Sequence, residues 1–116
     1  MNKTRIYHNP RCSKSRETLA LLENQQQDIE IVEYLKTPPT VEELSDILQQ
    51  LDMHPRQLLR TKETLYKELQ LDNKDLSDQE LIRVMCDNPK LIERPIVIKN
   101  NQAIIGRPPE AVLNIL

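Results

Sequence analysis

A cysteine in the loop after the first apolar run is the residue of this sequence best suited to covalent chemistry. Cys12 follows the short run 5–7 (RIY) and precedes a helical pattern, so we expect it in the turn between a first strand and a first helix. A helix N-terminus presents unpaired backbone N–H groups and a partial positive charge, which lower the pKa of a thiol and attract anions. Lys14 and Arg16 add basic side chains to the first helical turn. The sequence therefore predicts a nucleophilic thiolate beside an oxyanion site.

His8 is a second residue of this stretch that bears on the thiol. A free thiol with a pKa near 8.5 is only a few per cent thiolate at neutral pH, and a pKa about two units lower makes it mostly thiolate. We expect the helix terminus, the basic side chains and a protonated His8 to supply that shift together, because His8 stands shortly before Cys12. The alternative is that His8 only ends the first strand and hydrogen-bonds the backbone.

The spacing around Cys12 separates the possible cysteine chemistries. Dithiol oxidoreductases need a second cysteine at position 15, where this chain has Ser15, so a dithiol cycle at this loop is excluded. Phosphatase loops of the tyrosine-phosphatase type need an arginine at position 18, where this chain has Thr18, so that class is disfavoured. A zinc site on His8 and Cys12 would lack two further ligands nearby, and we expect no metal. What remains is a single-cysteine nucleophile whose later steps need thiols from elsewhere.

Two strands and a helix are predicted around this loop. Residues 4–8 are predicted as the first strand, residues 19–22 as the buried side of the helix, and residues 29–35 as the second strand. Strand, helix and strand within about 30 residues form a βαβ unit, in which the two strands are parallel.

A helical block is predicted over residues 40–88. The runs 40–43 (TVEE) and 77–80 (SDQE) have the spacing of capping boxes, each at the start of a helical pattern. Pro55 starts a further short turn that ends near Arg60, and Leu65 and Leu69 mark another helical piece. Cys86 lies on an apolar helix face, so we interpret it as a structural thiol.

The chain ends in a predicted hairpin and a last helix. Residues 96–99 and 102–105 flank the turn Asn100-Asn101, which indicates an antiparallel hairpin. Gly106, the single glycine of the sequence, indicates a backbone too close to another group for a side chain. The last helix begins at residues 108–109, and its residues 112, 113 and 116 are predicted to point inward. The order predicts one α/β domain over residues 1–116: a thioredoxin-like mixed sheet with a helical insertion at about 40–88.

Composition limits the classes of function. The 116 residues carry a net charge of −2 and contain neither Phe nor Trp, which disfavours nucleic acid and anionic membranes as partners. No apolar run approaches the roughly 20 residues of a membrane span, and the N-terminus lacks the apolar region of a signal peptide. We therefore expect a cytoplasmic protein, monomeric, with Cys12 and Cys86 as free thiols.

Three segments together resemble the glutaredoxin-dependent arsenate reductases. They are residues 8–16 (HNPRCSKSR), 93–97 (ERPIV) and 105–110 (IGRPPE). The predicted helical insertion is a further feature of the same resemblance. Within that family, the sequence is similar to a small bacterial subgroup whose cysteine loop reads Cys-Ser-Lys-Ser-Arg. Plasmid-type members have smaller residues at positions 11, 13 and 14, and Arg11 and Lys14 of this chain add positive charge near the loop.

The resemblance implies a role for each matching residue. It makes Cys12 the nucleophile, His8 the residue that lowers its pKa, and Ser15 the hydroxyl that hydrogen-bonds the thiolate. It places three arginines around the oxyanion, namely Arg60, Arg94 and Arg107. Guanidinium groups suit a tetrahedral dianion because they stay charged and bind bidentately. Read without the resemblance, Arg60 is a solvated arginine at a helix end. The thioredoxin-like resemblance also implies a cis peptide bond before Pro95.

The resemblance also implies a substrate and a reductant. The thiolate attacks arsenate, glutathione serves as co-substrate in reducing arsenic from the +5 to the +3 state, and glutaredoxin clears the mixed disulfide left on Cys12. No bound cofactor is expected. Two rivals stay open: a redox-responsive regulator of the same fold that binds RNA polymerase, and a thiol transferase that acts on glutathionylated proteins.

Overall fold

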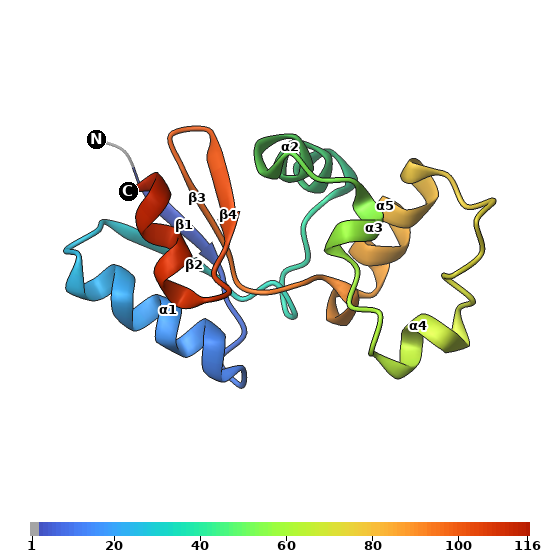
Figure 1. The fold of residues 1–116 in the computed structure, drawn as a ribbon, viewed down its shortest axis with the longest axis horizontal. Coiled ribbons are helices and arrows are strands. Elements are labelled where there is room, and N and C mark those ends of the chain that lie inside the picture. The colour runs from blue at the N-terminus through green and yellow to red at the C-terminus, as the bar shows by residue number, and fades with distance from the viewer. Residues whose placement is uncertain (1–2) are drawn as a thin grey trace. The chain divides into compact units, whose positions relative to one another are not determined.

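In a computed structural model that describes residues 3–116, the chain divides into two units (Figure 1). Unit 1 holds the chain up to Thr37 together with Arg94–Leu116, and unit 2 is Pro38–Glu93. The segment predicted as a helical insertion lies within unit 2, and the cysteine loop lies within unit 1.

Unit 1 is built on a four-stranded sheet with the strand order β2-β1-β3-β4. The strands are β1 (Thr4–Tyr7), β2 (Ile29–Val32), β3 (Ile96–Lys99) and β4 (Gln102–Ile105). β1 pairs in parallel with β2, and the pairs β1–β3 and β3–β4 are antiparallel. Asn100 and Asn101 both have positive φ, as a tight hairpin turn requires. These pairings confirm the predicted thioredoxin-like mixed sheet.

Helix α1 (Ser13–Asn24) and the 3₁₀ helix η2 (Pro109–Ile115) pack on one face of that sheet. Leu22 of α1 and Val112 of η2 form one buried cluster with Ile6 and Val97, which are paired across β1 and β3. Branched aliphatic side chains fill this core because the sequence has no Phe or Trp.

Three local predictions were wrong in detail. The C-terminal helix is 3₁₀, so its residues repeat every three positions, and Leu113 is 44% exposed beside the buried Val112. Ala20 of α1 is exposed, because the inward face of that helix is formed by Ser15, Thr18 and Leu22. β2 ends at Val32 rather than at residue 35, since the chain then turns and Lys36 N–H donates to the Glu33 carbonyl.

Unit 2 is helical. Its elements are α2 (Val41–Leu51), α3 (Pro55–Leu58), α4 (Thr64–Glu68), α5 (Asp78–Asp87) and the 3₁₀ turn η1 (Pro89–Leu91). Thr40 and Ser77 cap α2 and α5, and each capping box is closed by the glutamate three positions on, which confirms both predicted boxes. Among the described residues, no helix combines the length and apolar character that crossing a membrane requires.

Gly106 lies where two other segments of unit 1 approach its backbone. A Cβ at this position would stand 2.6 Å from Thr18 Oγ1 and 2.9 Å from Pro95 Cγ. The Arg94–Pro95 bond is cis, as expected, and so is Arg107–Pro108. The glycine therefore serves close packing, as the sequence indicated.

Replacing Gly106 by Ala is expected to destabilise the protein by about 1–3 kcal/mol, because the added methyl group overpacks a buried contact. Urea unfolding measures the change. The double variant Gly106→Ala, Thr18→Ala should recover part of the loss, since it removes the closest atom. An unchanged unfolding midpoint for Gly106→Ala would contradict the close approach.

Candidate active site

Cys12 occupies the N-cap of α1, directly after the loop that leaves β1. Its backbone is extended, with φ −95° and ψ 123°, and its carbonyl accepts the Arg16 N–H at 3.0 Å, which starts the helix. Cys12 N–H donates to the Asn9 carbonyl at 3.0 Å and closes the loop. The residue is only 9% exposed. The sulfur thus lies at the positive end of the α1 dipole, as the sequence predicted.

Opposing influences act on the pKa of Cys12. Burial raises it, but the backbone N–H groups of Ser15 and Lys14 and the charge of Arg94 lower it, and together they hold the pKa below its ordinary value. A further donor, Arg107 Nη2, lies 3.5 Å from the sulfur. The thiol is therefore more easily ionised than a free cysteine, which is the condition for nucleophilic attack.

The sheet register explains why two distant arginines meet at this sulfur. Tyr7 pairs with Ile96, and Ile96 pairs with Ile105, so these three residues form one row at the same end of the sheet. The cysteine loop leaves β1 at this row, Arg94 precedes β3 there, and Arg107 follows β4 there. Arg107 Nε donates to the Arg94 carbonyl at 2.8 Å, which ties the two segments together.

Ser15 and His8 are joined by a buried hydrogen bond. His8 Nδ1 and Ser15 Oγ are 2.6 Å apart, and Ser15 Oγ also accepts the Asn9 N–H at 3.0 Å. Both side chains are buried. The Ser15 hydroxyl is thus held by His8 and Asn9. The resemblance also implies a hydrogen bond from this hydroxyl to the Cys12 thiolate, and that bond stays a prediction.

The pKa of His8 is lowered below its ordinary value, first by burial and then by the charge of Arg16, while Glu33 opposes the shift. The imidazole is therefore mainly neutral at pH 7. In that state it acts on the site through its hydrogen bond to Ser15, and the nearby positive charge comes from Arg94 and Arg107.

Arg60 belongs to unit 2, where its side chain has partners of its own. Arg60 Nη1 lies 2.9 Å from Glu63 Oε1 and donates to the Lys90 carbonyl at 3.2 Å. Its predicted place beside the oxyanion stays a prediction.

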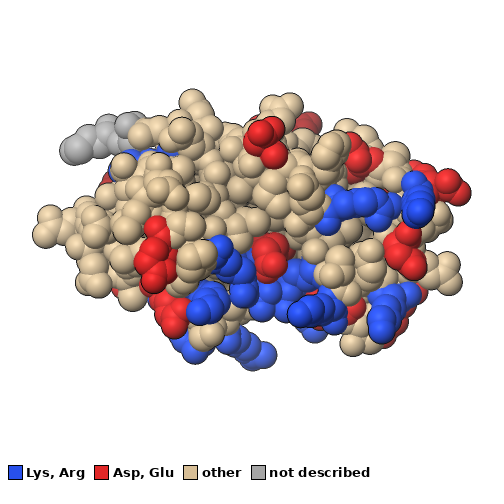
Figure 2. Space-filling view, viewed as in Figure 1, with Lys and Arg blue, Asp and Glu red and all other residues tan. Residues whose placement is uncertain are grey.

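Basic side chains cover the outer surface of the α1 N-terminus. Arg11, Lys14 and Arg16 are exposed, and Figure 2 shows Lys and Arg side chains gathered over this end of α1. Arg16 Nη1 donates to the Pro10 carbonyl at 2.9 Å, so it also braces the cysteine loop.

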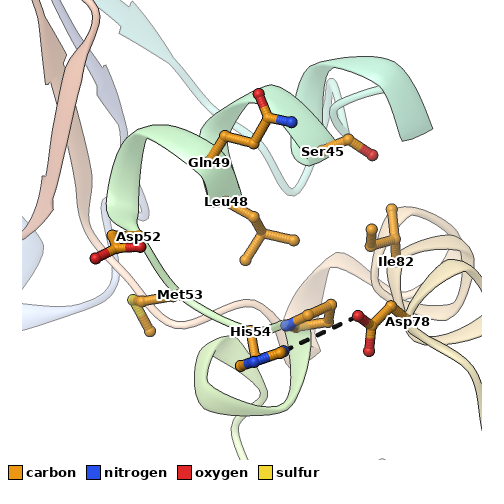
Figure 3. A pocket seen from close by; sticks show the side chains of 9 residues that line it. Ser45, Leu48, Gln49, Asp52, Met53, His54, Asp78 and Ile82 are labelled. Atoms are coloured by element: carbon orange, nitrogen blue, oxygen red, sulfur yellow. Dashed lines mark ion pairs between the residues drawn. The ribbon is translucent and has the colours of Figure 1, made fainter.

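A pocket of about 410 Å³ lies in unit 2. Figure 3 shows Leu48 and Ile82 on its walls and the pair of His54 Nδ1 with Asp78 Oδ2, which are 3.9 Å apart. Both side chains of this pair are largely exposed, so its attraction is weak. His54 is the exposed N-cap residue of α3. This pocket has no thiol and no arginine in its lining, unlike the site around Cys12.

Three residues of the Cys12 surroundings were missed by sequence reasoning. Asn9 holds Ser15 through its backbone, Thr18 contacts the backbone of Gly106, and Glu33 acts on His8. A backbone amide carries no residue-type signal. For Glu33 a signal existed, because the two strands were predicted to be parallel. The missing part was the register, in which Tyr7 pairs with Val32, so that His8 and Glu33 each follow a paired residue.

The two cysteines should ionise over different pH ranges. Burial, Asp87 and Glu43 raise the pKa of Cys86, whereas the pKa of Cys12 is lowered. Since only thiolates alkylate rapidly, iodoacetamide should modify Cys12 at a pH where Cys86 is still protonated. Mass spectrometry of the two peptides over a pH series measures both midpoints. Equal midpoints would contradict the assigned environments.

Arg94→Ala should raise the pKa of Cys12 by removing a charge that favours the thiolate. Alkylation at about pH 6.5 is expected to slow by about tenfold, the scale of one opposite charge near an ionisable group. Arg5→Ala is the matched control, because Arg5 carries the same charge on β1 and pairs with Glu30. An equal effect of both substitutions would show that net charge, rather than contact, sets the shift.

Comparisons with known proteins identify the family of the chain. Residues 7–115 match the model of the ArsC family. An uncharacterized protein of Escherichia coli is 56% identical over 98% of this chain and 97% of its own length. An arsenate reductase of Haemophilus influenzae is 55% identical over 96% of this chain and 97% of its own length. The structure of an arsenate reductase from Vibrio cholerae matches with a TM-score of 0.96 and 57% identity over 98% of both chains. Because the family model spans residues 7–115 and these relatives align over nearly the whole chain, this chain belongs to the ArsC family.

Proposed function

We propose that this protein is an arsenate reductase that uses Cys12 as its nucleophile. The observation that carries the proposal is the position of the Cys12 sulfur at the N-terminus of α1, where Arg107 Nη2 lies 3.5 Å away and the charge of Arg94 helps to lower the thiol pKa. Relatives that are named arsenate reductases support it. An oxyanion repels a thiolate, so their approach requires cations that contact both.

In the first step, the Cys12 thiolate attacks arsenic, an S–As bond forms, and an oxygen leaves as hydroxide or, once protonated, as water. Arg94 and Arg107 neutralise the negative charge that sulfur and oxyanion bring together, and Arg60 is proposed as a third donor. The bidentate geometry of guanidinium groups suits the paired oxygens of arsenate. These residues therefore bind and orient the substrate for in-line attack.

In the second step, the thiolate of glutathione takes part in reducing the arsenic. A disulfide forms between its sulfur and Cys12, the S–As bond breaks, and its electron pair stays on arsenic, which falls from +5 to +3. Glutaredoxin then exchanges with the mixed disulfide and returns Cys12 to the thiol. Ser15 supports this scheme, because without a thiol at that position the loop has no internal partner that would resolve Cys12. A cytoplasmic location and a monomeric state stay predictions of the sequence.

The proposal is tested by coupling turnover to NADPH oxidation through glutathione reductase, glutathione and glutaredoxin, with and without arsenate. NADPH consumption should depend on arsenate, and Cys12→Ser should lower it by about a thousandfold or more, since the nucleophile is lost. Cys86→Ser is the matched control and should leave the rate nearly unchanged.

Two outcomes would count against the proposal. Oxidation of NADPH with a glutathionylated protein but not with arsenate would make the protein a thiol transferase. No turnover, together with capture of RNA polymerase on the immobilised protein, would favour the regulator. A large loss in Cys86→Ser would instead show that a resolving thiol had been overlooked.

A further inference from the structure

A pocket of about 350 Å³ lies in unit 1 between α1 and the start of η2, and the proposed reaction leaves it unused. The two helices pack beside each other, as Figure 1 shows with η2 in red. One wall is a single stripe of α1, because Lys14, Glu17 and Leu21 are three and four positions apart and lie on the same helix face. The opposite wall is the segment 108–110.

Both walls of this pocket connect to the Cys12 sulfur. Lys14 directs its backbone N–H to the sulfur and also lines the pocket. Arg107 places Nη2 3.5 Å from the sulfur, and the next residue, Pro108, begins the opposite wall. A small molecule joined to Cys12 through a disulfide can therefore reach the pocket.

The charges of the pocket lining favour a zwitterion. Lys14 contributes one positive charge, and Glu17 and Glu110 contribute two negative charges, so the described lining has a net charge of −1. A second arsenate ion or a lone carboxylate would meet this net negative charge, which opposes its binding. A group with an ammonium and a carboxylate on the same carbon finds a partner for each of its charges.

The charged side chains of the lining are available to a ligand. Within the described residues 3–116, Glu110 forms no ion pair, and it is exposed. Lys14 Nζ lies 3.5 Å from Glu17 Oε2, but these side chains are 47% and 55% exposed, so the pair is weak. Lys14 also stands in the first turn of α1, where the helix dipole opposes a cation. A bound carboxylate would offset that opposition.

We propose that this pocket binds the γ-glutamyl end of glutathione, with Lys14 paired to its α-carboxylate and Glu110 to its α-ammonium group. The inference rests on the proposed function, in which glutathione is the co-substrate. Leu21 and Pro109 offer apolar surface to the methylene chain of the γ-glutamyl group. With this end held, the glutathione sulfur is oriented toward Cys12, which raises the rate of their reaction.

Mixed-disulfide formation with oxidised glutathione tests the pocket without arsenate. The Cys12 thiolate attacks the disulfide, a new S–S bond forms, the old one breaks, and one glutathione thiolate leaves. The rate, followed by mass spectrometry of the Cys12 peptide, should fall about threefold in Lys14→Met and in Glu110→Gln, the scale of one half-exposed charge pair. Lys3→Met and Glu23→Gln are matched controls, because Lys3 precedes β1 and Glu23 lies in the last turn of α1.

Three further disulfides show which end of glutathione the pocket holds. Each rate is divided by the rate with 2-hydroxyethyl disulfide, an uncharged probe, so that any change in the ionisation of Cys12 cancels. The disulfide of γ-glutamylcysteine keeps the proposed end and should show the same loss in Lys14→Met and Glu110→Gln as oxidised glutathione does. The disulfide of cysteinylglycine lacks that end, so its normalised rate should be the same in both variants as in the wild type.

Unchanged normalised rates with oxidised glutathione in folded Lys14→Met and Glu110→Gln would overturn the inference. So would equal losses in the two control variants, which would reduce the effect to net charge, or equal losses with the cysteinylglycine disulfide. A loss confined to the later reaction with glutaredoxin would also overturn it and assign this surface to the protein partner. A wild-type chain that fails to reduce arsenate but shows the expected losses would overturn the proposed function while supporting the pocket.

Discussion

The constraint on which the rest of unit 1 depends is the stabilisation of negative charge at the Cys12 sulfur, whose pKa is lowered. Burial works against that charge, so the fold must supply donors and cations that outweigh the loss of solvent. Some of them are local, because any N-cap side chain meets the free N–H groups of the first helical turn. The others come from residues 94 and 107, far along the chain. A helix terminus alone is available to many proteins, whereas this second set requires a particular sheet.

That sheet requirement is met by strand order and register rather than by any one contact. β3 lies next to β1 and runs antiparallel to it, so the segment that enters β3 begins beside the loop that leaves β1. The hairpin then returns β4 to the same end. Packing locks the arrangement: Thr18 Oγ1 donates to the Lys14 carbonyl at 2.8 Å and approaches the Gly106 carbonyl at 3.4 Å. The close contact at Gly106 thus connects the first turns of α1 to the segment that carries Arg107.

The sequence predicted those features whose signals are local or carried by residue type. The position of Cys12 before a helix was predicted from the helical pattern that follows it. The same holds for the capping residues Thr40 and Ser77, and for the close packing at the single glycine. The sequence predicted Leu22 on the inward face of α1, but it missed Thr18, which is polar and is buried for its contacts rather than its hydrophobicity. The exposure of Leu113 was not predicted, because the local sequence after Pro108 and Pro109 does not distinguish a 3₁₀ helix from an α-helix.

The serine at position 15 affects both the hydrogen bonding of the cysteine loop and the redox chemistry proposed for it. A cysteine there would compete with substrate for the Cys12 sulfur, since a neighbouring thiol closes a disulfide. A serine cannot be oxidised in that way, so on the proposed function the oxidising equivalents must leave on an external thiol. The same hydroxyl occupies the position between the imidazole of His8 and the loop backbone. A thiol would be a much weaker hydrogen-bond partner in that place. On the proposed function, dependence on an outside reductant and the buried hydrogen bond that holds His8 to the cysteine loop are therefore two consequences of one residue.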